Sequence, residues 1–135
     1  MKKILFIISL IVASVINASV SYQCPAQIDK DNQKDWELVT GEDAASNKFV
    51  YDGPISAILT TGKSRHYMLY PDLDPADSSL SKHLGSTEGN FWLVAPKTWI
   101  MCSYPFVKAV YFKRLPNILK ECATLSQHHD IMICE

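Results

Sequence analysis

The sequence predicts a mainly β fold: a single antiparallel domain, meander-like or sandwich-like, held by two disulfides. Three observations lead to this prediction. Short apolar or alternating stretches recur along the chain, and Gly, Pro, Asn and Asp separate them. Four cysteines, an even number, follow an N-terminus with the features of an exported protein. No repeat, low-complexity tract or long linker divides the chain into two domains.

The N-terminus has the pattern of a secretory signal peptide. Lys2 and Lys3 are followed by an apolar run, residues 4–16, which is too short to span a membrane comfortably. Ala18 is a small residue suited to the cleavage position. We therefore predict cleavage directly after Ala18 and export from the cytoplasm without a membrane anchor. The alternative is an uncleaved N-terminal anchor.

Removal of residues 1–18 leaves residues 19–135, enough for one domain with a single modest core. Two lysines leave with the signal, so 11 basic side chains remain against 14 acidic ones, a net charge of about −3. Nucleic-acid binding needs clustered Lys and Arg. The mildly acidic chain therefore predicts no nucleic-acid partner.

The first half of the domain is expected to form five strands: Tyr22–Ile28, Trp36–Thr40, Lys48–Tyr51, Ile55–Thr60 and Arg65–Tyr70. The third strand stops at Asp-Gly-Pro, residues 52–54, which is a strong turn signal. In the fifth, His66, Met68 and Tyr70 fall on one face with the period of two that is typical of strands.

Residues 71–90 form a long polar connection without a sustained period of two. A short helix, Pro75–Leu84, fits here because Asp74 can cap it and Pro75 suits its first position. A connection of this length in a small domain is unusual, and tends to be functional or mobile.

The second half completes the predicted strands with Phe91–Ala95, Thr98–Tyr104, Val107–Leu115, Lys120–Ser126 and Asp130–Cys134. The third of these is apolar on both faces, with Ala109 and Tyr111 on one and Val110 and Phe112 on the other. A strand of this kind is covered on both sides, so we expect it in the middle of a sheet or between layers. The whole pattern fits an all-β domain or an α+β fold dominated by a meander.

The cysteines Cys24, Cys102, Cys122 and Cys134 allow three disulfide pairings. A short turn at residues 127–129 would place Cys122 directly opposite Cys134, which favours that pair. Cys24 would then bond Cys102. The rival interpretation is a metal site, but no C-x-x-C and no His or Cys pair has ligand spacing, so no metal is predicted.

No catalytic arrangement stands out in the sequence. His66 follows Ser64 and Arg65, but no nucleophile elbow surrounds them. Two disulfides would occupy every thiol, and His128 and His129 fall at a predicted turn. We therefore expect a non-enzymatic protein with no catalytic residue and no cofactor.

The polar connection contains the candidate partner-binding residues, which are Asp72, Asp74, Asp77, His83 and Glu88. The glycine and the distal glutamate of an EF-hand are missing, so the carboxylates do not predict a calcium loop. Two interpretations remain open, a solvated acidic loop and a loop that binds a protein partner.

The three tryptophans, Trp36, Trp92 and Trp99, also have two interpretations. They can fill the core, as large aromatic side chains usually do. If two or more are exposed on one face, they can instead form a platform for a glycan.

Five segments of the chain carry a resemblance to known proteins, namely Tyr22-Gln23-Cys24-Pro25, Val50-Tyr51-Asp52-Gly53-Pro54, Trp99-Ile100-Met101-Cys102-Ser103-Tyr104, Leu115-Pro116 and Cys122. They resemble a family of small uncharacterised exported proteins of Gram-negative bacteria, some of them encoded near type VI secretion clusters. This resemblance implies a periplasmic immunity or inhibitor protein whose partner is a cell-wall-active enzyme or secreted effector. The alternative is a binding module for an envelope glycan or a small ligand.

A looser similarity connects the chain to periplasmic inhibitors of c-type lysozyme, which are also small, β-rich and disulfide-bonded. Those proteins carry a Ser-Gly-x-x-Tyr motif. This chain has Thr61-Gly62, and Tyr67 lies further along than the motif requires. The departure weakens the implication that lysozyme is the partner.

Overall fold

The computed structural model describes residues 19–29, 35–41 and 53–135. The predicted signal peptide, residues 1–18, and the predicted strand Lys48–Tyr51 lie outside these residues. The described strands are β1 Val20–Gln23, β2 Glu37–Val39, β3 Ser56–Thr60, β4 Gly89–Leu93, β5 Trp99–Ser103, β6 Val110–Arg114, β7 Glu121–Leu125 and β8 Ile131–Cys134. The described helices are the 3₁₀ turns η2 Arg65–Tyr67 and η3 Pro75–Asp77 and the α-helix α2 Ser79–Leu84.

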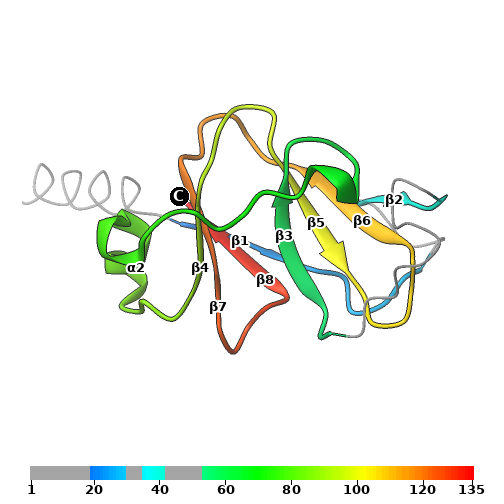
Figure 1. Ribbon diagram of the computed structural model, residues 1–135, viewed down its shortest axis with the longest axis horizontal. Coiled ribbons are helices and arrows are strands. Elements are labelled where there is room, and N and C mark those ends of the chain that lie inside the picture. Colours follow the sequence, from blue (N-terminus) through cyan, green and yellow to red (C-terminus); the bar gives the residue numbers. More distant parts are fainter. Residues whose placement is uncertain (1–18, 30–34, 42–52) are drawn as a thin grey trace, which may run out of the picture.

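The eight described strands form two antiparallel sheets (Figure 1). Sheet A has the order β1-β8-β7-β4, and sheet B has the order β2-β6-β5-β3. The first and last strands are neighbours, since Val20 of β1 is opposite Cys134 of β8. The predicted mainly β fold is confirmed, and the two sheets make it sandwich-like.

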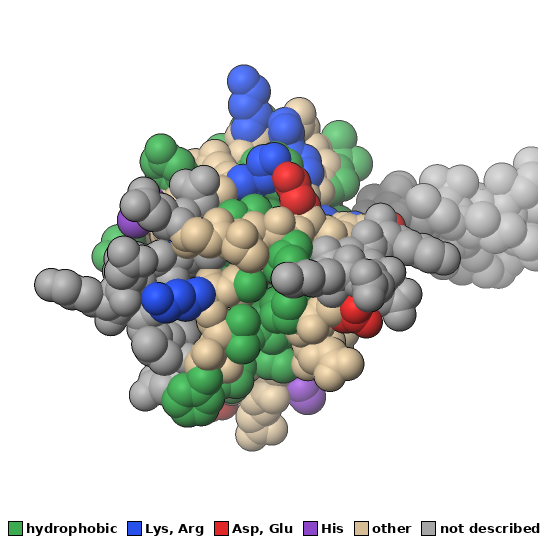
Figure 2. Space-filling model, turned by 90° about the vertical axis from the view of Figure 1, so that its right-hand side faces the viewer, with side chains coloured by type: hydrophobic (Ala, Val, Ile, Leu, Met, Phe, Trp, Pro, Cys, Tyr) green, Lys and Arg blue, Asp and Glu red, His purple; other side chains and the backbone are tan. Residues whose placement is uncertain are grey.

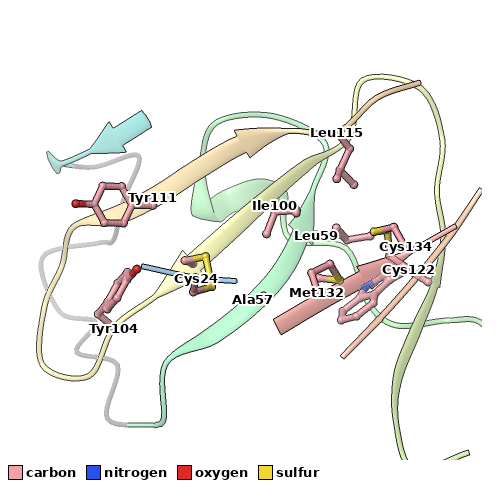
Figure 3. Packing of buried hydrophobic residues seen from close by; sticks show 12 residues of the cluster. Cys24, Ala57, Leu59, Ile100, Tyr104, Tyr111, Leu115, Cys122, Met132 and Cys134 are labelled. Carbon is pink, nitrogen blue, oxygen red and sulfur yellow. A yellow bond between two sulfur atoms is a disulfide. The ribbon is translucent and has the colours of Figure 1, made fainter. Parts of the chain in front are cut away.

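One apolar core joins the two sheets (Figure 3). Leu59 and Ile100 from sheet B pack in the same cluster as Met132 from sheet A, and all three are fully buried. β6 is apolar on both faces, as predicted. Tyr111 of β6 belongs to the shared core, whereas Phe112 belongs to a second buried cluster in sheet B. This placement explains the two-sided hydrophobic pattern of the strand.

Both expected disulfides are confirmed. Cys122 and Cys134 are directly opposite each other in β7 and β8, with their Cα atoms 4.1 Å apart. Cys24 follows β1 of sheet A and bonds Cys102 of β5 in sheet B, with a Cα–Cα distance of 5.8 Å. The first bond therefore joins neighbouring strands, and the second joins the two sheets.

The predicted strand Arg65–Tyr70 is wrong. The Ser64 side chain accepts a hydrogen bond from the His66 backbone N–H (3.2 Å) and so caps the 3₁₀ turn η2. The chain then returns to the edge of β3, where the Leu69 N–H donates to the Leu59 carbonyl (2.8 Å). A local side-chain cap therefore prevailed over the alternating pattern.

Several other predicted boundaries also moved, including that of Phe91–Ala95, which is Gly89–Leu93 in the structure. The first strand ends at Gln23 instead of Ile28, because Cys24 is drawn into the disulfide and Pro25 has no N–H for a ladder. The predicted helix Pro75–Leu84 is divided at Ser78, whose backbone is extended and which ends η3 and caps α2. The predicted strand Val107–Leu115 begins only at Val110, after a turn.

Tyr104 is expected to make the folded state less stable at alkaline pH. Its hydroxyl donates to the Pro25 carbonyl (2.7 Å), and its ring meets Tyr111 edge-on at 5.8 Å. Burial, and secondarily the neighbouring Tyr111, raise the Tyr104 pKa above its ordinary value of 10.0. The folded state therefore retains a proton that the unfolded chain releases near pH 10, so stability is full below that pH and falls as the pH rises through it.

We expect Tyr104→Phe to lower the free energy of unfolding by about 1 kcal/mol at pH 7, because one hydrogen bond is lost. The same variant should lose less further stability than the wild type when the pH rises from about 9 to about 10.5. Urea unfolding at the three pH values measures both effects. Equal alkaline losses in the two proteins would show that Tyr104 is not the group responsible.

Candidate functional site

The polar segment 71–90 is fixed on sheet A by specific contacts. The Ser78 hydroxyl donates to Glu121 Oε1 of β7 (2.7 Å), and the Leu80 N–H donates to the same oxygen (3.3 Å). Leu80 is fully buried against Phe91 and Ala123. Helix α2 therefore lies on the face of sheet A that points away from the shared core, at one end of the molecule (Figure 1).

The five predicted partner-binding residues are all exposed, but they lie in three settings. Asp72, Asp74 and Asp77 precede α2, and Asp74 caps η3 by accepting from the Ala76 N–H (3.0 Å). His83 Nδ1 lies 2.6 Å from Glu135 Oε2, next to the end of β8. Glu88 lines a separate hollow of about 160 Å³ beside the β7–β8 turn. Only the three aspartates form one stretch.

A cleft of about 430 Å³, here called the Trp92 cleft, is lined in part by Tyr70 and Pro71, which directly precede Asp72 in the sequence. Its lining combines apolar and aromatic side chains with a few polar ones, and consists of Ile58, Arg65, His66, Met68, Leu69, Tyr70, Pro71, Asn90 and Trp92. Trp92 is 2% exposed, and its Nε1–H donates to the Leu69 carbonyl (3.1 Å). Tyr70 and Met68 are instead 89% and 47% exposed. The cleft therefore combines a buried tryptophan, held by a hydrogen bond, with side chains that are exposed to solvent.

The backbone of the 61–69 loop holds these side chains in place. The Thr61 N–H donates to the Tyr67 carbonyl (3.0 Å), which closes the loop around η2. A β-carbon at Gly62 would lie 3.3 Å from Tyr67 Cδ2, so the absence of a side chain lets the Tyr67 ring pack there. Thr61-Gly62 and Tyr67 are therefore neighbours in space although their sequence spacing departs from the lysozyme-inhibitor motif.

The sequence interpretation missed the cleft, although a signal for it was present. Tyr67, Met68 and Tyr70 are large apolar side chains that directly precede an acidic stretch. The alternation of His66, Met68 and Tyr70 suggested one face of a strand, whereas the structure places these residues in and after a 3₁₀ turn and exposes all three.

Two of the tryptophans line a second depression. Trp92 is buried, whereas Trp36 and Trp99 are half-buried and line a groove of about 520 Å³, here called the Trp36–Trp99 groove. It lies at the end of sheet B where β2 begins and β6 ends, and it shares no lining residue with the Trp92 cleft. The sequence could not decide which tryptophans reach solvent, because exposure depends on the packing of distant strands.

The described residues show little that resembles catalytic or metal chemistry. Among them, no three His, Cys, Asp or Glu side chains gather as a metal site would require. The Ser64 hydroxyl, the nucleophile nearest to His66 in sequence, accepts from the His66 backbone as a helix cap. Within the same residues, no helix has the length and apolarity needed to cross a membrane.

No protein-family model, curated protein or solved structure matches this chain. The family resemblance therefore stays a prediction.

Proposed function

We propose that this protein is a non-enzymatic periplasmic binding protein that acts as an immunity or inhibitor protein against a cell-wall-active enzyme. A cleaved signal peptide would bring it to the periplasm without leaving a membrane anchor. The two disulfides fit an oxidising compartment outside the cytoplasm and so support this location. The resemblance to exported proteins encoded near secretion clusters supports a wall-active enzyme or secreted effector as the partner.

The main support for this proposal is the Trp92 cleft. Tyr, Trp and Met are enriched in protein interfaces, and the energetic centres of interfaces are often aromatic side chains seated in pockets. Here Tyr70 and Met68 project to solvent beside the fixed Trp92. A tyrosine also provides a large contact area at low cost in conformational entropy. The cleft can therefore receive an apolar side chain from a partner.

The acidic residues next to the cleft indicate the charge that we expect on the partner's surface. Asp72, Asp74 and Asp77 are exposed and directly follow Pro71, which lines the cleft. Such carboxylates accelerate association with a basic surface and fix its orientation. The partner we propose therefore presents Lys or Arg around an apolar protrusion near its active site. Binding would inhibit it by occlusion, which breaks no covalent bond and needs no catalytic residue here.

Tyr70→Ala tests the cleft. We expect it to weaken partner binding by about thirtyfold or more, because loss of an interface hot spot costs about 2 kcal/mol or more. The melting temperature should stay nearly unchanged, since Tyr70 is 89% exposed. The matched control is Ile118→Ala, which removes a side chain that is 84% exposed and lies outside the cleft. Equal effects of the two substitutions on affinity would exclude the cleft as the interface.

The aspartates should act mainly on the association rate. We expect Asp72→Asn/Asp74→Asn/Asp77→Asn to slow association and to reduce its salt dependence. Asparagine keeps an oxygen acceptor at residue 74, so the η3 cap is retained. Stopped-flow association at low and high salt measures the effect. An unchanged rate at low salt would show that the acidic stretch lies outside the interface.

The partner for these measurements comes from a periplasmic pull-down. The tagged full-length chain is expressed with its own N-terminus and with the product of the adjacent gene, and co-purifying proteins are identified. We expect a stoichiometric complex in which peptidoglycan degradation by the partner is suppressed. A partner that retains full activity in the complex, or recovery of the chain alone, would contradict the inhibitor function.

The alternative function, binding of an envelope glycan or a small ligand, is favoured by a different observation. Trp36 and Trp99, both half-buried, line one groove, so two aromatic side chains are available together at one surface. Because the groove and the cleft share no lining residue, the two functions are compatible.

A further inference from the structure

The Trp36–Trp99 groove has a distinctive mixture of lining groups. β2 and the residues before it contribute Asp35, Trp36 and Glu37, β5 contributes Trp99, and β6 contributes Lys113 and Arg114. Its volume of about 520 Å³ is within the range of small-molecule binding sites. Figure 2 faces the side of the molecule on which β2 lies and shows hydrophobic side chains beside basic and acidic ones.

Cations lie against both indole rings. Lys63 Nζ is 5.5 Å and Arg114 Cζ is 5.6 Å from the centre of the Trp99 ring. Lys113 Nζ is 5.8 Å from the centre of the Trp36 ring. These distances are within the range of cation–π attraction, which holds the long basic side chains over the rings. The groove therefore presents positioned positive charge rather than bare indole surfaces.

The three cations differ in their hydrogen-bonding partners, and only Lys63 is paired with a carboxylate among the described residues. Lys63 forms an ion pair with Glu37 (2.8 Å), and Lys113 donates to the Asp35 backbone carbonyl (3.3 Å). Arg114 is exposed, and within the described parts of the chain it has no carboxylate partner. A guanidinium held against an aromatic ring loses little further freedom when it binds a carboxylate through two hydrogen bonds. Arg114 is thus the group best placed to bind an anion.

The acidic side chains in the same groove narrow the choice of ligand. Asp35 would repel a ligand that carried only negative charge, whereas hydroxyl groups can donate hydrogen bonds to Asp35 and to Glu37, whose charge the ion pair with Lys63 balances. A neutral glycan has no negative group that could form an ion pair with Arg114. The lining therefore fits a ligand that carries both carboxylates and hydroxyls.

We infer that the Trp36–Trp99 groove is a binding site for a carboxylated oligosaccharide, with Arg114 bound to a sugar carboxylate and Asp35 and Glu37 accepting from sugar hydroxyls. This site is independent of the proposed inhibitor function. It would let the protein associate with acidic glycans of the envelope while the Trp92 cleft stays open to a protein partner.

The test is titration of the full-length chain with three probes of equal length. They are tetragalacturonate, the neutral tetramer of N-acetylglucosamine, and tetraglutamate. Calorimetry gives the affinity, and tryptophan fluorescence reports on the groove, since two of the three tryptophans line it. We expect tetragalacturonate to bind most tightly and to change the fluorescence. Tighter or equal binding of the neutral tetramer, or of tetraglutamate, would overturn the assignment.

Arg114→Gln should weaken tetragalacturonate binding by roughly tenfold, the loss expected for a charge-assisted bidentate contact. The matched control is Lys82→Gln, the same loss of one charge at an exposed residue of α2. Equal losses in the two variants would mean nonspecific attraction and would overturn the site. Tyr70→Ala should leave glycan binding unchanged, so failure of this inference is distinguishable from failure of the inhibitor proposal.

Discussion

Removal of the Cys24–Cys102 disulfide by Cys24→Ala/Cys102→Ala is expected to lower the free energy of unfolding by about 4.5 kcal/mol, from the chain-entropy relation for a long loop. The two cysteines are 78 residues apart, so the bond restrains most of the unfolded domain. Single domains are typically stable by only about 5–15 kcal/mol. The variant should therefore be marginally folded, which denaturant unfolding under non-reducing conditions measures.

The second disulfide provides the matched control. Cys122→Ala/Cys134→Ala opens a bond that spans only 12 residues, for which the same relation gives about 3 kcal/mol. Both bonds are buried, so the packing lost with the sulfur atoms is similar in the two variants. If the short-range bond proves the more stabilising, loop entropy is not the main contribution of these disulfides.

Gly89→Ala is expected to lower the free energy of unfolding by about 3–5 kcal/mol, because it combines an unfavourable backbone conformation with a backbone clash. Gly89 has φ +154°, and a β-carbon there would lie 2.2 Å from the Thr124 carbonyl oxygen and 3.0 Å from Leu125 Cα. Both atoms belong to β7, the strand paired with β4. The start of β4 would have to separate from β7, and β4 also carries Trp92 of the cleft.

Gly85→Ala isolates the conformational part of that cost. Gly85 ends α2 with φ +67°, but a β-carbon there would meet no atom within 4 Å. We expect a loss of only about 1 kcal/mol, the usual cost of a left-handed alanine. Thermal and urea unfolding of both variants give the comparison. Similar losses for the two glycines would mean that β4 accommodates a side chain at residue 89.

Most of the strand framework could be predicted from local patterns. The Cys122–Cys134 bond followed from a turn that placed the two cysteines opposite each other. The double-sided apolar pattern around Tyr111 and Phe112 placed that strand in the middle of a sheet, as the structure confirms. Asp74 and Pro75 marked the start of a helical turn. In each case, neighbouring residues determine the outcome.

The predictions that were wrong involve competition between local signals. In Arg65–Tyr70 a period of two favoured a strand, whereas Ser64 favoured a cap, and the cap prevailed. In Pro75–Leu84 Asp74 caps η3 and Ser78 caps α2, and the Ser78 hydroxyl donates to Glu121, which is 43 residues away in the sequence. A local sequence pattern does not show that Ser78 and Glu121 will meet, so it cannot include the stabilisation from their hydrogen bond.

Local patterns along the chain predicted the mainly β class, most of the strands, the preferred disulfide pairing and the acidic character of residues 71–90. Which apolar side chains remain exposed depended on the packing of the folded domain. Trp92 is buried and Tyr70 is exposed, although both lie in short apolar stretches. The Trp92 cleft forms because β4 pairs with β7 and the 61–69 loop is hydrogen-bonded to β3. Hydrophobic burial depends on which distant segments meet, and a local sequence pattern does not specify that.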